Sequence, residues 1–201
     1  MAAITSDQVK KLREKTGAGM MDCKRALEET GGDMDAAIEY LRKKGAATAA
    51  KRADRETNQG VVEAYIHAGG RIGAMVELNC ETDFVAKTPQ FKTLAHDIAM
   101  QIAAMNPQFI SRDQVPQEVQ QKELEIYKSQ AQNEGKPAQI AEKIAQGRLD
   151  KYFQEVCLLE QSFIKDSGKT IKDIIDEATA AIGEKISVRR FQRYHLGEDG
   201  K

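Results

Sequence analysis

The chain has 201 residues, of which 30 % are charged, and its formal net charge of -1 excludes bulk electrostatic attraction to nucleic acid or to a membrane surface. Hydrophobic residues make up 41 %, enough for one sizeable domain or for a small module joined to a medium one. No apolar run is long enough to cross a bilayer, and residues 1–11 lack the apolar core of a signal peptide, so we expect no membrane contact.

Residues 1–45 are predicted to form a small module of three short helices. Thr5 and Gln8 have the spacing of a capping box, which predicts that the first helix begins there. The second and third helices are expected over about residues 22–29 and 34–45, and a glycine ends each of them. A module this small is marginally stable alone, so we expect it to serve recognition rather than chemistry.

Met20 and Met21 are the candidate docking residues of this module. Two adjacent methionines on a helix cannot both face the same core, so at least one is available to a partner. The nearby Gly17-Ala18-Gly19 resembles part of a phosphate-binding loop. No strand precedes it, however, and we interpret it as a tight turn between helices.

Residues 46–59 are predicted to be a linker. They are rich in alanine and then in charged residues, and we expect them to let the small module move. The alternative is that the third helix continues into this segment.

Residues 60–201 are predicted to form the core domain. A β-hairpin is expected over 60–78, because apolar and other residues alternate on both arms around a Gly69-Gly70 turn. The apolar positions are Val62, Ala64 and Ile66 on the first arm and Ile72, Ala74, Val76 and Leu78 on the second. A final strand over 185–196 is expected to pair with the hairpin in a three-stranded antiparallel sheet.

Helices complete the predicted core domain. Thr88 and Pro89 mark the start of a helix whose apolar stripe, from Phe91 to Met105, is expected to cover the apolar face of the hairpin. Residues 112–160 are polar with few apolar positions and a break at residues 135–137, which predicts a protruding helical hairpin. Thr170 is expected to cap a last helix. The predicted fold class is therefore α+β.

No catalytic constellation is evident. The three histidines, His67, His96 and His195, are scattered over two strands and a helix. The sequence SGKT at residues 167–170 resembles the end of a phosphate-binding loop, but it lacks the required earlier glycine and a strand leading into it. We therefore expect a binding protein rather than an enzyme, with no metal site and no cofactor.

The cysteines support an intracellular interpretation. Cys23, Cys80 and Cys157 are an odd number, are widely spaced and form no CxxC pair and no metal-ligand pattern. We expect them to be buried small apolar side chains in a reducing, cytoplasmic compartment.

Direct binding of nucleic acid is not expected either. Arg189, Arg190 and Arg193 are close in sequence, but no aromatic residues interleave them as in a stacking platform. The net charge gives no basic footprint. RNA contact through these arginines is kept as a minor alternative.

The segment CETDFVAK, residues 80–87, places an acid and a large aromatic side by side between a strand and a helix. Asp83 can cap the helix start with its carboxylate. Phe84 either packs in the core, as the general burial tendency of phenylalanine favours, or is held out for a partner.

Two long segments carry a resemblance to a known family. LREKTGAGMMDCK (residues 12–24) and ELNCETDFVAK (residues 77–87) resemble the two signatures of translation elongation factor Ts, in the same order. The sequence GKP at residues 135–137, followed by IAEK at 140–143, resembles the turn of that family's helical hairpin. The resemblance covers the whole chain.

The resemblance implies a guanine-nucleotide exchange factor for the GTPase elongation factor Tu. The N-terminal module would be the family's ubiquitin-associated-like domain, which docks on the GTPase. Thr82, Asp83, Phe84 and Val85 would be the segment that intrudes near the partner's Mg²⁺ site, so that Phe84 is interpreted as a probe. No group on the chain would be consumed, which again implies no enzymatic reaction.

One departure from the family concerns the core. Longer members carry the strand-strand-helix unit twice, whereas this chain has it once, between residues 60 and 105. A symmetric homodimer through the core domains would restore the second copy. Two other interpretations stay open: a ubiquitin-associated-type adaptor with an unrelated core, and an RNA-binding accessory protein of the ribosome.

Overall fold

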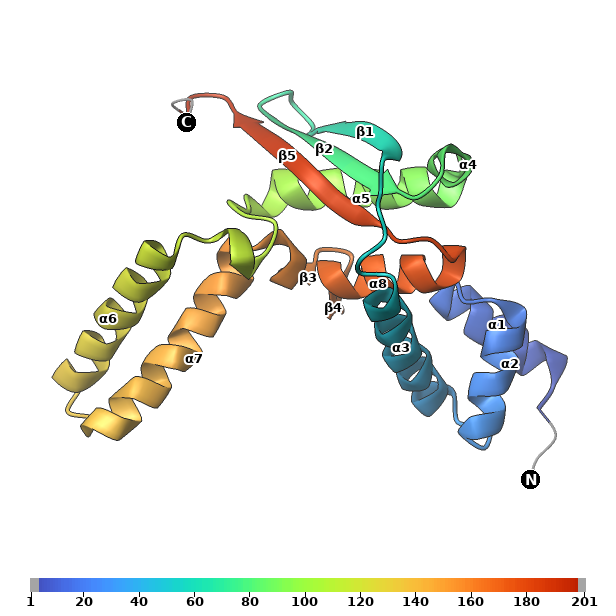
Figure 1. The fold of residues 1–201 in the computed structure, drawn as a ribbon, viewed down its shortest axis with the longest axis horizontal. Coiled ribbons are helices and arrows are strands. Elements are labelled where there is room, and N and C mark those ends of the chain that lie inside the picture. Colours follow the sequence, from blue (N-terminus) through green and yellow to red (C-terminus); the bar gives the residue numbers. More distant parts are fainter. Residues whose placement is uncertain (1–3, 199–201) are drawn as a thin grey trace.

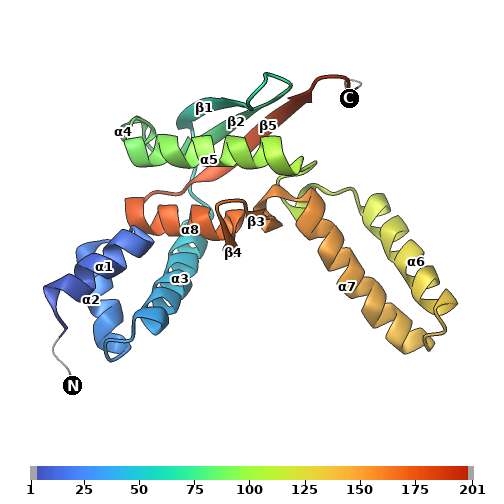
Figure 2. The same ribbon diagram turned by 180° about the vertical axis from the view of Figure 1, so that it is seen from behind.

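The computed structural model describes residues 4–198 as a central core with two helical arms (Figure 1). In the core, a three-stranded sheet lies on helix α5, and helix α8 runs on the other side of α5 (Figure 2). The three N-terminal helices form one arm and a long helical hairpin forms the other. The α+β class, the N-terminal helices and the protruding hairpin predicted from the sequence are confirmed.

The N-terminal arm consists of α1 (Ser6–Thr16), α2 (Met20–Glu29) and α3 (Met34–Lys51). Thr5 caps α1 through the predicted capping box with Gln8. Helix α2 begins at Met20, two residues before the predicted start, because Gly19 is in the extended conformation of an N-cap. The buried side chains that join the three helices are Val9, Leu12, Cys23, Ala26, Leu27 and Ala37.

The prediction that Gly45 ends the third helix is wrong, and the alternative of a longer helix is correct. Helix α3 continues through Gly45 to Lys51. Gly45 is buried because α8 packs against it: a Cβ at this position would lie 3.7 Å from the Cβ of Ala180. A side chain at this distance would make ordinary van der Waals contact, so the position packs on α8 as part of the helix instead of ending it.

The sheet contains β1 (Gln59–Ile66), β2 (Ile72–Cys80) and β5 (Ser187–His195), in the order β1-β2-β5. Both pairings are antiparallel, as predicted. Gly69 and Gly70 have φ values of +89° and +67°, which lie in the left-handed region that a tight hairpin turn needs.

The face of strand β1 that packs toward α5 is not the one predicted. The sequence predicts the apolar residues Val62, Ala64 and Ile66 on that face, and they lie on the other one. The register pairs Val61 with Leu78 and Val62 with Glu77. Because directly paired residues share a face of the sheet, Val61 lies on the side of the buried Leu78 and Val62 lies on the other side. Alternation gives the period of a strand, but the turn sets its register.

The outer face of the sheet consequently exposes several large apolar side chains. We use the term outer face for Val62, Ile66, Met75 and Tyr194, whose exposed fractions are 60 %, 66 %, 47 % and 67 %. A shallow groove on this face is lined by Ile66, Met75, Tyr194 and Leu196.

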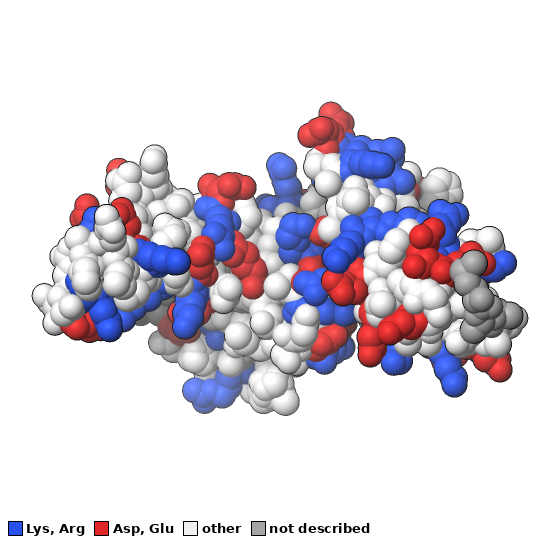
Figure 3. All heavy atoms as spheres, turned by 90° about the horizontal axis from the view of Figure 1, so that it is seen from below, with Lys and Arg blue, Asp and Glu red and all other residues white. Residues whose placement is uncertain are grey.

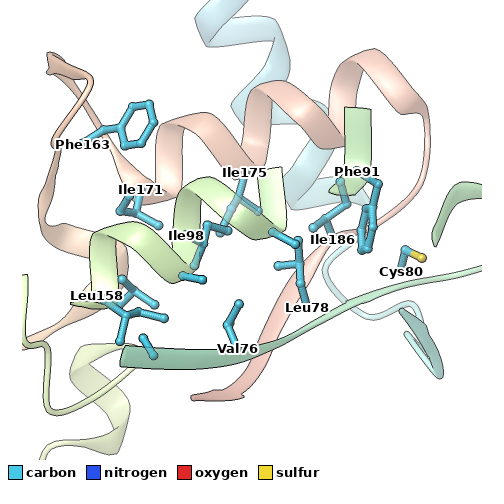
Figure 4. Close-up of a cluster of buried hydrophobic side chains, with 14 of the residues drawn as sticks. Val76, Leu78, Cys80, Phe91, Ile98, Leu158, Phe163, Ile171, Ile175 and Ile186 are labelled. Carbon is cyan, nitrogen blue, oxygen red and sulfur yellow. The ribbon is translucent and has the colours of Figure 1, made fainter. Parts of the chain in front are cut away.

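The inner face of the sheet packs on α5 (Pro89–Met105). Thr88 caps this helix, and Asn106 ends it with a left-handed φ of 49°. The predicted stripe is confirmed except for Met105, the last residue of the helix, which is 47 % exposed. Figure 4 shows the resulting core, in which Phe91 and Ile98 of α5 lie among side chains of β2, of α8 and of the segments on either side of α8.

Helix α8 (Ile171–Ile182) begins at the predicted capping box of Thr170 and Asp173 and ends at Gly183. It follows a small hairpin of β3 (Ser162–Phe163) and β4 (Asp166–Thr170), which the sequence did not predict. Lys169 in this hairpin pairs with Glu177 of α8 at 2.7 Å, so the SGKT sequence has a structural use.

The second arm consists of α6 (Gln117–Asn133) and α7 (Ala138–Val156), with single 3₁₀ turns at Arg112–Gln114 and Leu158–Glu160. Its seam is thin, as predicted, and is made of small and apolar side chains: Ala131, Ala141, Ala145, Leu149 and Phe153. Arg112 fixes the base of the arm, since it pairs with Asp150 and Glu160 and lies 4.6 Å from the centre of the Phe153 ring.

All three cysteines are free and buried, as predicted. Burial raises the pKa of the Cys157 thiol to about 11, so this group is protonated at neutral pH. Among residues 4–198, the helices are all too short or too polar to span a membrane.

Candidate functional site

Residues 82–85, which we call the wedge segment, lie at the exposed junction between β2 and α5. They enter a short helix, α4 (Asp83–Ala86). The side chain of Phe84 is 79 % exposed, the largest exposed fraction among the large hydrophobic residues that the structure describes. Val85 packs against the core beside it. The core location that remained open for Phe84 is therefore excluded, and its ring is available to a partner.

Thr82, not Asp83, is the N-cap of α4. The Thr82 hydroxyl accepts a hydrogen bond from the backbone N–H of Val85 at 3.4 Å. Asp83 lies in the first turn, where its carboxylate is 2.5 Å from Nζ of Lys87. The hydrogen bond from Lys87 holds the pKa of Asp83 below its usual value, so the wedge segment carries a negative charge next to its ring at neutral pH.

A carboxylate from the end of α8 holds the base of the wedge segment. Glu184 accepts the backbone N–H of Thr82 at 3.0 Å and its hydroxyl at 2.7 Å. Two hydrogen bonds to one carboxylate fix both the position and the direction of the chain entering α4. No local pattern in the sequence points to this contact, because the two residues are 102 positions apart.

Glu81 provides a second anchor. It accepts the backbone N–H of Lys185 at 2.7 Å and lies 2.9 Å from Arg55 and 3.5 Å from Arg52. The hydrogen bond from Lys185, followed by the interactions with Arg55 and Arg52, lowers the pKa of Glu81. Sequence reasoning placed both arginines in a linker and gave them no role, since a contact between distant segments leaves no local pattern.

Met20 and Met21 are the first two residues of α2 and are 44 % and 67 % exposed. Neither belongs to the buried cluster of the N-terminal arm. Helices α2 and α4 lie at the same end of the molecule, opposite the α6–α7 hairpin (Figure 1 and Figure 2). The candidate residues are thus distributed over two elements at one end.

Two of the histidines considered above pair with acidic side chains. His96 is 3.0 Å from Glu63, and His195 is 3.0 Å from Glu198. Within residues 4–198, no three His, Cys, Asp or Glu side chains gather in a way that could hold a metal ion.

Two of the three arginines on the last strand also have partners. Arg190 pairs with Glu77, and Arg193 pairs with Glu198 and donates to the backbone oxygen of Ala103. Viewed from below, acidic and basic side chains alternate over the surface without a large region of one sign (Figure 3). This face offers no basic stripe of the kind that tracks a phosphate backbone.

Comparison with known proteins gives a consistent result. A family model described as Elongation factor TS matches residues 5–198. Elongation factor Ts of Carboxydothermus hydrogenoformans is 65 % identical over 195 residues, which cover 97 % of this chain and 90 % of that protein. The corresponding protein of Moorella thermoacetica is 61 % identical over 195 residues, which cover 97 % and 96 % of the two chains.

Proposed function

The chain belongs to the elongation factor Ts family, and from this premise we propose that it binds elongation factor Tu and promotes release of GDP through its wedge segment. It acts as a nucleotide exchange factor in translation and not as a catalyst of bond breaking. We place its action in the cytoplasm, where translation takes place. The observation that carries the proposed role of the wedge segment is the exposed, anchored ring of Phe84.

The ring of Phe84 enters between elements of the GTPase near its nucleotide site. GDP is held largely through its phosphates and a bridging Mg²⁺, which neutralises their charge and keeps ordered ligands around itself. A rigid aromatic inserted nearby displaces the backbone and side chains that position those ligands. The anchors Glu81 and Glu184 support this action, because a wedge on a loose loop would bend before it moved its partner.

The negative charge of Asp83 contributes to the same disturbance of the metal site. Its carboxylate, ionised at neutral pH, lies next to the ring and competes for the positive groups and water that surround the metal. Once Mg²⁺ binding is weakened, the negative charge of the GDP phosphates is poorly neutralised and the nucleotide leaves faster. By linkage, GDP weakens the binding of this chain by the same factor, so exchange is reversible and an excess of GTP sets its direction.

Met20 and Met21 form the second contact with the GTPase in this proposal. Exposed methionines are flexible, polarisable side chains that adapt to an apolar surface. Their position on a separate arm gives the chain two points of attachment. Docking through the methionines adds affinity and keeps the wedge segment aimed.

Release of a fluorescent GDP analogue from elongation factor Tu tests the function. We expect the purified chain to accelerate GDP release on the order of a hundredfold when Mg²⁺ is present, which is the size of a typical coupling between two ligands. Because the wedge acts through the metal site, this stimulation shrinks to a few-fold in a chelator, which removes Mg²⁺ beforehand. Equal stimulation with and without Mg²⁺ contradicts the route through the metal, and no stimulation under either condition contradicts the exchange function itself.

We further propose that the core domains of two chains form a symmetric dimer through the outer face of the sheet. The chain has a single strand-strand-helix unit, and its outer face exposes four large apolar side chains. An apolar sheet face of this kind is a common site of association, and one two-fold axis satisfies the same face on both copies.

Met75→Glu is expected to convert this dimer to a monomer at micromolar concentration, since it places two buried charges near the two-fold contact. Light scattering measures the mass. Met105→Glu is the matched control, because Met105 is exposed to the same 47 % but lies on α5, behind the sheet. A monomeric mass for the unmodified chain contradicts the dimer.

A further inference from the structure

Helix α3 is clamped to α8 by a fork of hydrogen bonds. Arg42 donates from Nε to Oδ1 of Asp173 at 3.1 Å and from Nη2 to Oδ2 at 3.0 Å. A guanidinium that engages both carboxylate oxygens fixes the direction of approach as well as the distance. Asp173 is itself held in place, since it accepts the backbone N–H of Thr170 at 2.9 Å and its hydroxyl at 2.8 Å in the capping box of α8.

The charge on Asp173 is secure at neutral pH. Burial raises the pKa of its carboxyl, but hydrogen bonds from Thr170 and from Arg42 outweigh that effect, and the net pKa lies below its usual value. The fork therefore joins two full charges. The side chain of Asp173 is only 20 % exposed, so water screens this pair less than an ordinary surface pair.

One turn beyond the fork, the two helices come close together. Gly45 faces Ala180, and a Cβ on the glycine would lie in ordinary van der Waals contact with that alanine. The residue before Gly45, Lys44, pairs with Asp22 of α2 at 2.6 Å. Asp22 follows Met20 and Met21 directly, so the two methionines are tied through α3 to α8.

The other end of α8 holds the wedge segment. Glu184, two residues after the end of the helix, fixes Thr82, and the backbone of Lys185 binds Glu81. Arg52 and Arg55, just beyond α3, reach the same Glu81. Helix α2, which carries the two methionines, and the wedge segment are therefore both held in place through contacts that lead to α8.

We propose that α8 is a frame that holds the two methionines and the wedge segment at one fixed separation in the free protein, and that Arg42 and Asp173 are positioning residues for exchange. The inference rests on the proposed function. It replaces the expectation of a linker that lets the module move. When the two contact sites are held at a fixed separation, binding through the second site costs little further conformational entropy. Once the first site is bound, the effective concentration of the second site is therefore high.

A disulfide between α3 and α8 tests whether the docked arrangement is the active one. The Gly45→Cys and Ala180→Cys pair suits a cross-link, since the two Cβ positions are 3.7 Å apart and disulfides favour about 3.8 Å. The native cysteines are buried and do not compete. We expect the oxidised protein to stimulate GDP release within about twofold of its reduced form. Loss of exchange on oxidation, restored by reduction, overturns the inference, as does failure of the two thiols to cross-link.

Arg42→Ala tests the fork without a cross-link. We expect the concentration for half-maximal stimulation to rise about tenfold while the rate at saturation stays unchanged, because the wedge is intact and only the aim of the module is lost. Lys43→Ala is the matched control, since Lys43 is the next residue on α3 and pairs with Glu39 on the exposed side of the helix.

An unchanged half-maximal concentration for Arg42→Ala overturns the inference. A fall in the saturating rate alone also overturns it, because that result would mean that Arg42 affects the action of the wedge segment and not the docking of the module. The unmodified chain separates these outcomes from the proposed function: if it does not stimulate GDP release, the function fails, whereas normal stimulation with insensitive variants rejects the frame alone.

Discussion

Replacement of Phe84 by alanine is expected to reduce the stimulated release of GDP by about thirtyfold or more while the fold stays intact. Aromatic residues that fill a pocket of a partner typically contribute at least about 2 kcal/mol of binding free energy, which corresponds to that factor. The ring of Phe84 is 79 % exposed in the free chain, so its removal leaves no cavity. The measurement is GDP release as a function of factor concentration, together with the thermal unfolding curve.

Two further variants make the result specific. Ile140→Ala removes a large apolar side chain that is 50 % exposed near the start of α7, far from the wedge segment, and is expected to change neither exchange nor stability. Phe84→Leu keeps an apolar group without the flat ring and is expected to fall between alanine and the unmodified chain. Exchange unaffected by Phe84→Ala would refute the wedge, and unfolding of this variant would indicate a structural use of the ring.

The elements that the sequence predicted well are those whose signals are local. The Thr5 and Thr170 capping boxes each satisfy backbone N–H groups within three residues, so their geometry follows from spacing alone. The hairpin follows from alternation around two glycines for the same reason. In these places, chemistry within a few residues determines the backbone.

The elements that the sequence did not predict depend on partners far along the chain. Gly45 has the appearance of a helix stop, but its packing against α8 more than a hundred residues later keeps it helical. Glu184 shows no motif at all, although it fixes the wedge segment. The family resemblance identified residues 82–85 but could not identify what holds them, because an anchor is defined by geometry.

The same limit explains the two phenylalanines near the site. Phe84 and Phe91 are seven residues apart, and composition alone favours burial for both. The structure separates them: one projects from α4, and the other lies in the core at 0 % exposure. Their substitutions should therefore separate function from stability.

Phe91→Ala is expected to lower the free energy of unfolding by about 3–5 kcal/mol, the usual cost of removing a fully buried phenylalanine ring and leaving a cavity. Since a domain of this kind is stable by only about 5–15 kcal/mol, the loss is a large share of the total. Phe91 packs with Cys80 and Ile186 where the sheet, α5 and α8 meet (Figure 4), and these rigid elements cannot close around the gap.

Urea unfolding followed by circular dichroism measures this loss, with Phe84→Ala as the control that should keep the unmodified midpoint. At low temperature, where Phe91→Ala is still folded, its exchange activity per folded molecule should remain close to that of the unmodified chain, because Phe91 is fully buried in its own core. A loss below about 1 kcal/mol would mean that the core collapses around the missing ring. Equal destabilisation by both alanine variants would contradict the division of roles between an exposed and a buried phenylalanine.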